Sequence, residues 1–209
     1  DFRIIMLNYT YGTNGLKVDI PRIINYIDKE IMKGDIAEAK LFNPDFIIAN
    51  MHWGLEYERI PSREQRELAD WLMRQGVDLV IGSHPHVVQP MELRRGKEGV
   101  PDRLVVYSLG NFISNMSREH TDGGVMVKVV LGRKGLRRYI VSAQYSLIYS
   151  SRYKNEQGKE DIRVVPAASW SGKNQNSSFS VDSALIKYVN NTRLFLKGNN
   201  KEVEEYIFE

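Results

Sequence analysis

Three histidines stand at positions where their imidazole groups could bind a metal ion. His52 directly follows an apolar run, and His84 and His86 lie in the segment Gly-Ser-His-Pro-His after a second apolar run. Imidazole nitrogen is a ligand for Zn, Mn and Fe, and a His-x-His pair can present two nitrogens together. Pro85 limits the freedom of this loop, because its ring fixes φ. The residue types and their spacing therefore predict a divalent metal site.

The elements before these histidines explain how they could meet. Residues 46–50 and 77–81 are continuous apolar runs, which predict parallel strands buried on both faces. Between them, Ser62 with Gln65 forms a capping box, and Gly76 is a C-terminal stop, so a helix is predicted. Such a strand–helix–strand unit makes the two strands parallel. Both histidine loops would then leave the same sheet edge, where open α/β sheets bind ligands.

A different interpretation of each histidine stays open. A single histidine in a loop is often a surface residue that hydrogen-bonds to its neighbours. For His120, in the polar residues 118–122 with no strand before it, this interpretation is preferred. For the other three, the shared position after buried strands favours the metal site.

The charge of the site poses a problem, because three neutral imidazoles bring no negative charge. A two-metal hydrolytic site needs carboxylates that neutralise the cations. Glu56 is the nearest candidate, whereas Asp78 lies at the far end of its strand. We therefore expect either a mononuclear site or further ligands upstream of Asp1.

Three further residues are candidates for contact with a substrate. Trp53 and Tyr57 flank the His52 loop and could pack over a substrate, although loop aromatics more often cover the edge of the core. Asn111 follows the predicted strand 104–108 and could hydrogen-bond to a substrate oxyanion or carboxylate. The alternative for Asn111 is a turn formed with Gly110.

The rest of the chain predicts one α/β domain over residues 1–209, with parallel strands first and antiparallel strands later. Residues 1–131 carry the motifs, and residues 35–42 predict a helix with Asp35 as its N-cap. Residues 150–180 read as loop, whereas residues 181–197 and 202–208 predict a helical tail. The other predicted strands are residues 2–8, 23–27, 104–108, 125–131 and 139–149, the last two joined by a hairpin turn at 132–135.

Composition excludes several classes of protein. The 209 residues include no cysteine, which removes disulfides, thiolate metal sites and cysteine nucleophiles. A net charge of +3 does not indicate a nucleic-acid partner. No apolar run approaches the roughly 20 residues that cross a bilayer. The start at Asp1, inside a predicted strand, suggests a piece of a longer protein.

Four segments resemble successive signature blocks of the CapA family, which is named for bacterial capsule and poly-γ-glutamate biosynthesis. In chain order, they are Tyr-Thr-Tyr-Gly-Thr-Asn-Gly at 9–15, Met-His-Trp-Gly-Leu-Glu-Tyr at 51–57, Gly-Ser-His-Pro-His-Val-Val-Gln at 82–89 and Tyr-Ser-Leu-Gly-Asn-Phe at 107–112. That family is similar to the calcineurin-like metallophosphatases. The resemblance implies an α/β/β/α sandwich with a two-metal site, truncated here at its N-terminus.

The resemblance also implies roles for the candidate residues. His52 matches the lone histidine of the superfamily, and His84 and His86 match its Gly-His-x-His block, here with Ser83 inserted after Gly82. The earlier Asp-x-His, bridging Asp and Asn-His blocks are absent before His52, which implies that the N-terminal part of the domain is missing. Glu56 would join the histidines as a catalytic residue.

The function implied by the resemblance is metal-dependent hydrolysis, or a related transfer, in capsule or envelope polymer synthesis. The cofactor would be Mn, Zn or Fe, and the substrate an anionic polymer or a small molecule containing a phosphoester or amide. The alternative is a component that binds polymer or assembles a membrane synthase complex without turnover. The expected location is the extracytoplasmic cell envelope, with a tether upstream of this chain.

Overall fold

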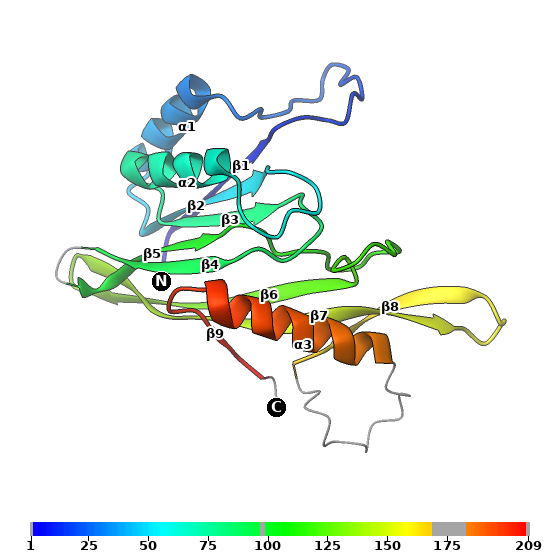
Figure 1. The fold of residues 1–209 in the computed structure, drawn as a ribbon. Coiled ribbons are helices and arrows are strands. Elements are labelled where there is room, and N and C mark those ends of the chain that lie inside the picture. The colour runs from blue at the N-terminus through cyan, green and yellow to red at the C-terminus, as the bar shows by residue number, and fades with distance from the viewer. Residues whose placement is uncertain (1, 97–98, 169–182, 208–209) are drawn as a thin grey trace.

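The computed structural model describes residues 2–96, 99–168 and 183–207, which form layers of helix and sheet (Figure 1). Helices α1 and α2 cover one face of a five-stranded sheet, and the other face packs on a second sheet. The mixed α/β fold predicted from the sequence, metallophosphatase-like with two stacked sheets, is confirmed.

The first sheet has the order β1-β2-β3-β5-β4. Strands β1, β2, β3 and β5 run parallel to one another, and β4 pairs antiparallel with β5. The elements are β1 (Ile4–Thr10), α1 (Lys29–Leu41), β2 (Phe46–His52), α2 (Arg63–Gln75), β3 (Leu79–Ser83), β4 (Met91–Arg95) and β5 (Pro101–Val106). The carboxyl ends of β1, β2, β3 and β5 therefore share one edge.

Helix α2 forms where its sequence signals place it. The Ser62 side chain accepts from the Gln65 N–H, and the Gln65 side chain accepts from the Ser62 N–H, which completes the capping box. Gly76 ends the helix at φ 103°, a left-handed conformation that glycine adopts readily. The apolar stripe of α2 buries Ala69 and Leu72. The predicted β2-α2-β3 unit is thus confirmed, with β2 and β3 parallel.

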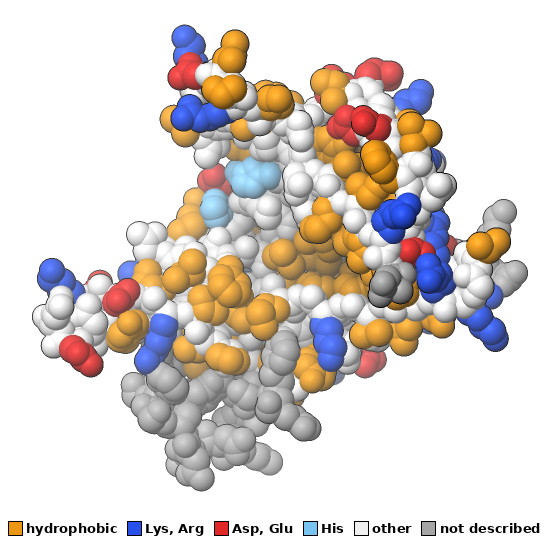
Figure 2. All heavy atoms as spheres, turned by 180° about the vertical axis from the view of Figure 1, so that it is seen from behind, with side chains coloured by type: hydrophobic (Ala, Val, Ile, Leu, Met, Phe, Trp, Pro, Cys, Tyr) orange, Lys and Arg blue, Asp and Glu red, His pale blue; other side chains and the backbone are white. Residues whose placement is uncertain are grey.

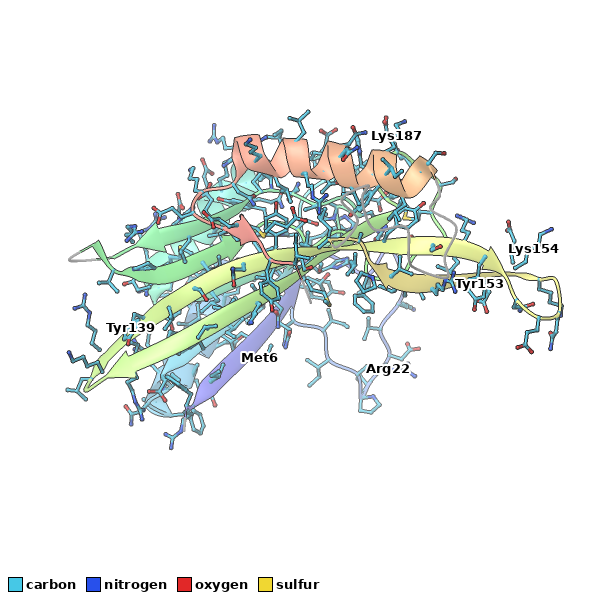
Figure 3. The ribbon with its side chains drawn as sticks, turned by 90° about the horizontal axis from the view of Figure 1, so that it is seen from below. Met6, Arg22, Tyr139, Tyr153, Lys154 and Lys187 are labelled. Atoms are coloured by element: carbon cyan, nitrogen blue, oxygen red, sulfur yellow. The ribbon has the colours of Figure 1, made fainter. Side chains whose placement is uncertain are left out.

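The second sheet contains β6 (Gly123–Lys134), β7 (Arg137–Lys154), β8 (Glu160–Pro166) and the short β9 (Glu204–Glu205). Strands β6 and β7 form the predicted hairpin, which turns at Gly135 with φ 62°. Figure 3 shows the β7–β8 hairpin projecting beyond the body of the molecule, with Tyr153 and Lys154 on the projecting part.

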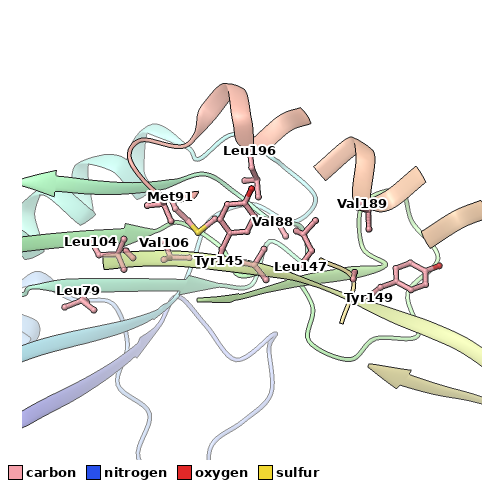
Figure 4. Close-up of a cluster of buried hydrophobic side chains, with 14 of the residues drawn as sticks. Leu79, Val88, Met91, Leu104, Val106, Tyr145, Leu147, Tyr149, Val189 and Leu196 are labelled. Atoms are coloured by element: carbon pink, nitrogen blue, oxygen red, sulfur yellow. The ribbon is translucent and has the colours of Figure 1, made fainter. Parts of the chain in front are cut away.

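Two apolar cores hold the layers together. One lies between the first sheet and helices α1 and α2, and includes Met32, Ile36 and Leu72. The other joins the two sheets and helix α3 (Ser183–Asn199), as the close-up in Figure 4 shows. Leu196 of α3 packs into the same cluster as Met91 of β4 and Tyr145 of β7. Helix α3 therefore contributes to the core shared by both sheets.

Helix α1 begins earlier than the sequence predicts. Asp28, not Asp35, is its N-cap, because the Asp28 side chain accepts from the Glu30 and Ile31 N–H groups. Asp35 lies inside the helix and accepts a hydrogen bond from the Tyr9 hydroxyl. The predicted strand at 23–27 is also wrong, since only Tyr26 makes a bridge, to Thr10.

The C-terminal predictions need further correction. Residues 150–180 were expected to be loop, but β7 extends to Lys154 and β8 follows, while residues 169–182 lie outside the described part. The expected helix at 202–208 is wrong, because β9 pairs with β7. Strand β4, which no local pattern indicated, pairs with β5 at the edge of the first sheet.

Candidate metal-binding cleft

The three candidate histidines lie in a row at the carboxyl edge of the first sheet. His52 ends β2 and pairs in register with Ser83, the last residue of β3. The ring centroids of His52 and His84 are 4.7 Å apart, and those of His84 and His86 are 6.0 Å apart. Figure 2 shows the exposed histidine surface gathered in one place on this face of the molecule. The β-α-β unit therefore brings together side chains that are 34 positions apart in sequence, from 52 to 86.

Backbone hydrogen bonds hold the two histidine loops against each other. The Trp53 N–H donates to the Ser83 carbonyl at 3.1 Å, and the Tyr57 N–H donates to the Pro85 carbonyl at 2.8 Å. His84 and His86 have φ of 100° and 62°, in the left-handed region where residues other than glycine are uncommon. Such conformations cluster at functional sites, where the surrounding structure maintains them.

Glu56 joins this row. Ligand atoms of Glu56, His84 and His86 all lie within 4.8 Å of one another. His52 is outside this closest set but contacts His84 through its ring. Asp78 lies at the opposite end of β3, where its carboxylate accepts from the Ile47 N–H and from Arg103. Among the described residues, Glu56 is thus the carboxylate that accompanies the histidines.

Asn111 orients His86. Its side-chain oxygen lies 3.0 Å from His86 Nδ1, and its amide nitrogen donates to the Thr121 carbonyl at 2.9 Å. The amide is fixed from both sides, so it sets the direction in which the His86 ring points. Metal-binding histidines characteristically use their second nitrogen in this way.

Burial controls the charge of two of the histidines. It is the main cause that lowers the pKa of His52, and proximity to His86 lowers it further. Burial likewise lowers the pKa of His84, with a further contribution from His52. Both are therefore neutral at pH 7, the form in which imidazole binds a metal ion.

The two aromatic residues predicted to contact a substrate lie in different surroundings. Tyr57 stacks near His86 at 5.9 Å, and the Arg118 guanidinium lies 3.9 Å from the centre of the Tyr57 ring. Trp53 is only 2% exposed, and its indole N–H donates to the Tyr107 carbonyl. Tyr57 thus lies beside the histidine row, whereas Trp53 packs in the core, as the alternative for loop aromatics anticipated.

Tyr11 is a cleft residue that sequence reasoning did not single out. Its ring centroid lies 4.5 Å from that of His84 and 5.8 Å from that of His52. The signal was present in the block at 9–15, because Tyr11 follows a strand that ends at the same sheet edge. His120 lies elsewhere, and its charged neighbours include Arg59, Glu119 and Asp122.

The donor set fits a divalent cation. Two imidazoles and one carboxylate, close enough to share an ion, match the mixed nitrogen and oxygen ligands of Zn, Mn and Fe sites. A neutral His84 and an anionic carboxylate give the cluster the charge that a cation requires.

Comparison with known proteins identifies the family of the chain that contains this cleft. The family described as bacterial capsule synthesis protein PGA_cap matches residues 1–116, more than half of the chain. The chain belongs to the PGA_cap family. The matched residues include all three histidines of the row, Glu56 and Asn111. The resemblance to CapA proteins deduced from the four motif blocks is confirmed.

Two curated relatives each match about half of the chain. The PGA biosynthesis protein CapA of Bacillus subtilis (strain 168) is 35% identical over 115 residues, which cover 55% of this chain and 28% of the relative. The capsule biosynthesis protein CapA of Bacillus anthracis is 35% identical over 107 residues, or 51% of this chain and 24% of the relative. The matched region thus spans about a quarter of each relative. Within the described residues, none of the helices has the length and apolar character needed to cross a membrane.

Proposed function

We propose that the chain takes part in the synthesis of a bacterial capsule or envelope polymer of the poly-γ-glutamate type, as a metal-dependent hydrolase. The observation that carries this proposal is the convergence of Glu56, His84 and His86 within 4.8 Å, in a chain of a capsule synthesis family. His52 completes the cleft on its other side, and its ring contacts His84.

Each residue has a defined part in this proposal. His84, His86 and Glu56 would hold a divalent cation, with His52 at the rim of the same site. The cation supplies Lewis acidity toward a carbonyl or phosphoryl oxygen of the substrate. Asn111 positions His86, and Tyr57 and Tyr11 provide aromatic surface beside the row.

The proposed partners follow from the same family. We place the protein at the extracytoplasmic envelope, tethered by a segment upstream of this chain and acting on an anionic polymer beside a membrane synthase complex. The names of the two Bacillus relatives refer to capsule and PGA biosynthesis, which supports an association with the envelope.

A second function is favoured by a specific observation. Glu56 is the one carboxylate that the described residues bring to the histidine cluster, whereas a two-metal hydrolytic site needs several. A protein that binds polymer or assembles a complex without turnover could retain such a site.

The two functions are separated by comparing His84→Ala, His86→Ala and Glu56→Gln in the full-length protein. Metal content, thermal melting and hydrolysis of poly-γ-glutamate are measured for each, with exposed Asn190→Ala in α3 as control. If the protein is a hydrolase, we expect the three variants to lose metal and turnover. Their free energy of unfolding, obtained from thermal melting, should stay within about 1 kcal/mol of that of the parent. Unchanged polymer output in cells carrying the metal-free variants would instead support the assembly function.

A further inference from the structure

Two hollows flank the histidine row, one at each end. The first, of about 400 Å³, is lined by His52 and Ser83 together with side chains from β1, β2 and the loop that follows β1. The second, of about 530 Å³, begins at His86 and Asn111 and continues to the start of β8. His84 stands between them, in contact with His52 on one side and near His86 on the other. The candidate metal cluster thus lies between the two hollows, and we call the histidine row together with both hollows the depression.

The order of the strands defines the direction of this depression. Asn8 belongs to β1, His52 to β2, the His84–His86 loop follows β3, and Asn111 follows β5. These strands are consecutive neighbours in the sheet. Three strand spacings of about 4.8 Å give a length of about 14 Å. An extended α-linked peptide spans at most about 3.5 Å per residue, so this distance corresponds to about four residues.

The first hollow has the chemistry of a site that recognises amide groups. Asn8, Asn25 and Asn50 line it, and none of its lining residues among the described ones is Lys, Arg, Asp or Glu. Asn8 and Asn50 are direct partners in the β1–β2 register, and the Asn50 amide nitrogen donates to the Asn8 side-chain oxygen at 2.8 Å.

That bond leaves the Asn8 amide nitrogen as a donor group and the Asn50 side-chain oxygen as an acceptor group for a ligand. Within the described part of the chain, the Asn8 amide nitrogen and the Asn50 side-chain oxygen make no other hydrogen bond. Exchanging the oxygen and nitrogen assignments of both amides would still leave one of each. An amide link likewise offers one carbonyl acceptor and one N–H donor, so it can satisfy both groups at once.

We propose that this cleft binds an extended polyamide chain across the histidine row, with an amide link of the chain seated on the Asn8–Asn50 pair. The inference rests on the proposed function, because it names the substrate class of the same site. A site with a hollow at each end accommodates the interior of a polymer, whereas a site for a terminal group needs only one. The reacting link would then be an internal one.

The test measures binding without turnover. Full-length protein in EDTA is titrated calorimetrically with γ-linked glutamate oligomers of one, two, four and eight units. The γ-linked unit contains two more backbone bonds than an α-linked residue and extends to about 6 Å, so two to three units span the cleft and a chain of four units fills it completely. We expect affinity to rise from one to four units and to stay within about twofold between four and eight. Equal affinity for one and eight units, or a continued rise of more than tenfold beyond four, would overturn the inference.

Variants test the amide pair itself. Asn8→Ala, at an exposed position, and Asn50→Ala, at a half-buried one, should each weaken binding of the four-unit oligomer by about three- to tenfold, as expected for one hydrogen bond. Asn190→Ala is the matched control and should bind like the parent. If both Asn8→Ala and Asn50→Ala bind like Asn190→Ala, the pair does not recognise the chain.

The two proposals fail in different ways. Graded binding in EDTA by a protein without hydrolase activity would preserve the inference and refute the enzyme. Hydrolysis by a protein whose binding does not depend on oligomer length would preserve the enzyme and refute the inference.

Discussion

At the scale of single residues, the cleft depends on side chains that hold other side chains. Asn111 contacts His86 and is itself fixed by the Thr121 carbonyl. The Gln65 and Gln89 side chains hydrogen-bond in the interior at 2.9 Å, and Gln89 also donates to the Glu58 carbonyl. These buried amides connect α2 to the loop that carries Glu56. The conformation of this loop is therefore stabilised by hydrogen bonds to the interior of the protein.

Asn111→Ala should weaken metal binding without removing a ligand. The His86 ring would lose the partner that sets its orientation, and loss of such partners typically lowers metal affinity about 10- to 100-fold. The measurement is a competition titration of Zn or Mn against a chelator. Asn190→Ala, in α3, should leave the affinity unchanged, and an unaltered affinity in Asn111→Ala would show that the amide does not orient a ligand.

Three of the site residues that the sequence predicted lie at the end of a buried strand or shortly after it. That position places His52, His84 and Asn111 at a common edge once the strands are parallel. Their roles stay predictions, but their proximity follows from local patterns. The contact of Tyr11 with two histidines could not be predicted in this way, because it depends on how the loop after β1 folds back.

At the scale of elements, the sequence predicted a helix correctly where it contained both a start signal and a stop signal. Helix α2 has a capping box at one end and Gly76 at the other, and the predicted helix agrees with the observed one. Helix α1 has a polar sequence with a buried face of only three residues, so its first two turns were missed. Strands β4 and β9 form by pairing with β5 and β7. Such pairing depends on contacts between distant parts of the chain, so the local sequence did not predict these two strands.

Removal of the α2 cap should destabilise the protein measurably. Ser62→Ala deletes the oxygen that accepts from the Gln65 N–H, and loss of such a cap costs about 1 kcal/mol. Urea denaturation is the measurement, with exposed Ser117→Ala as the control that should change little. Equal stability of the two variants would mean that the helix start is held by other contacts.

Strand β3 should tolerate no side chain at Gly82. A Cβ added there would lie 2.0 Å from the Tyr107 carbonyl oxygen and 2.5 Å from the Trp53 indole nitrogen. We expect Gly82→Ala to lower the free energy of unfolding by about 3 kcal/mol, since the backbone must move. Gly12→Ala has no atom within 4 Å of the new Cβ and should be nearly neutral in the same denaturation experiment.

At the scale of the whole molecule, one core joins the two sheets to α3, so stability should respond to ionisation inside that core. Tyr145 of β7 is 5% exposed and belongs to this cluster. Burial is the main cause that raises its pKa to about 12; nearby Glu205 raises it further, and Arg193 opposes the rise. Because the folded-state pKa is above the usual value of 10.0, the favourable contribution is complete below pH 10.

The stability of the protein should therefore decline between about pH 10 and about pH 12 as Tyr145 ionises. Tyr145→Phe removes that ionisation and should show a smaller decline over the same window, measured by urea denaturation at each pH. Tyr26→Phe, at an exposed position, is the control. A decline in Tyr145→Phe equal to that of the parent would assign the alkaline sensitivity to other groups.

The left-handed backbone at His84 and His86 also has an evolutionary consequence. Strained conformations of this kind cost on the order of 1–3 kcal/mol per residue, and glycine avoids most of that cost. Replacement by glycine would therefore favour folding while it removes a ligand. Without a function for the cleft, nothing would oppose such a replacement, so histidine at both positions would exchange folding stability for the candidate metal site.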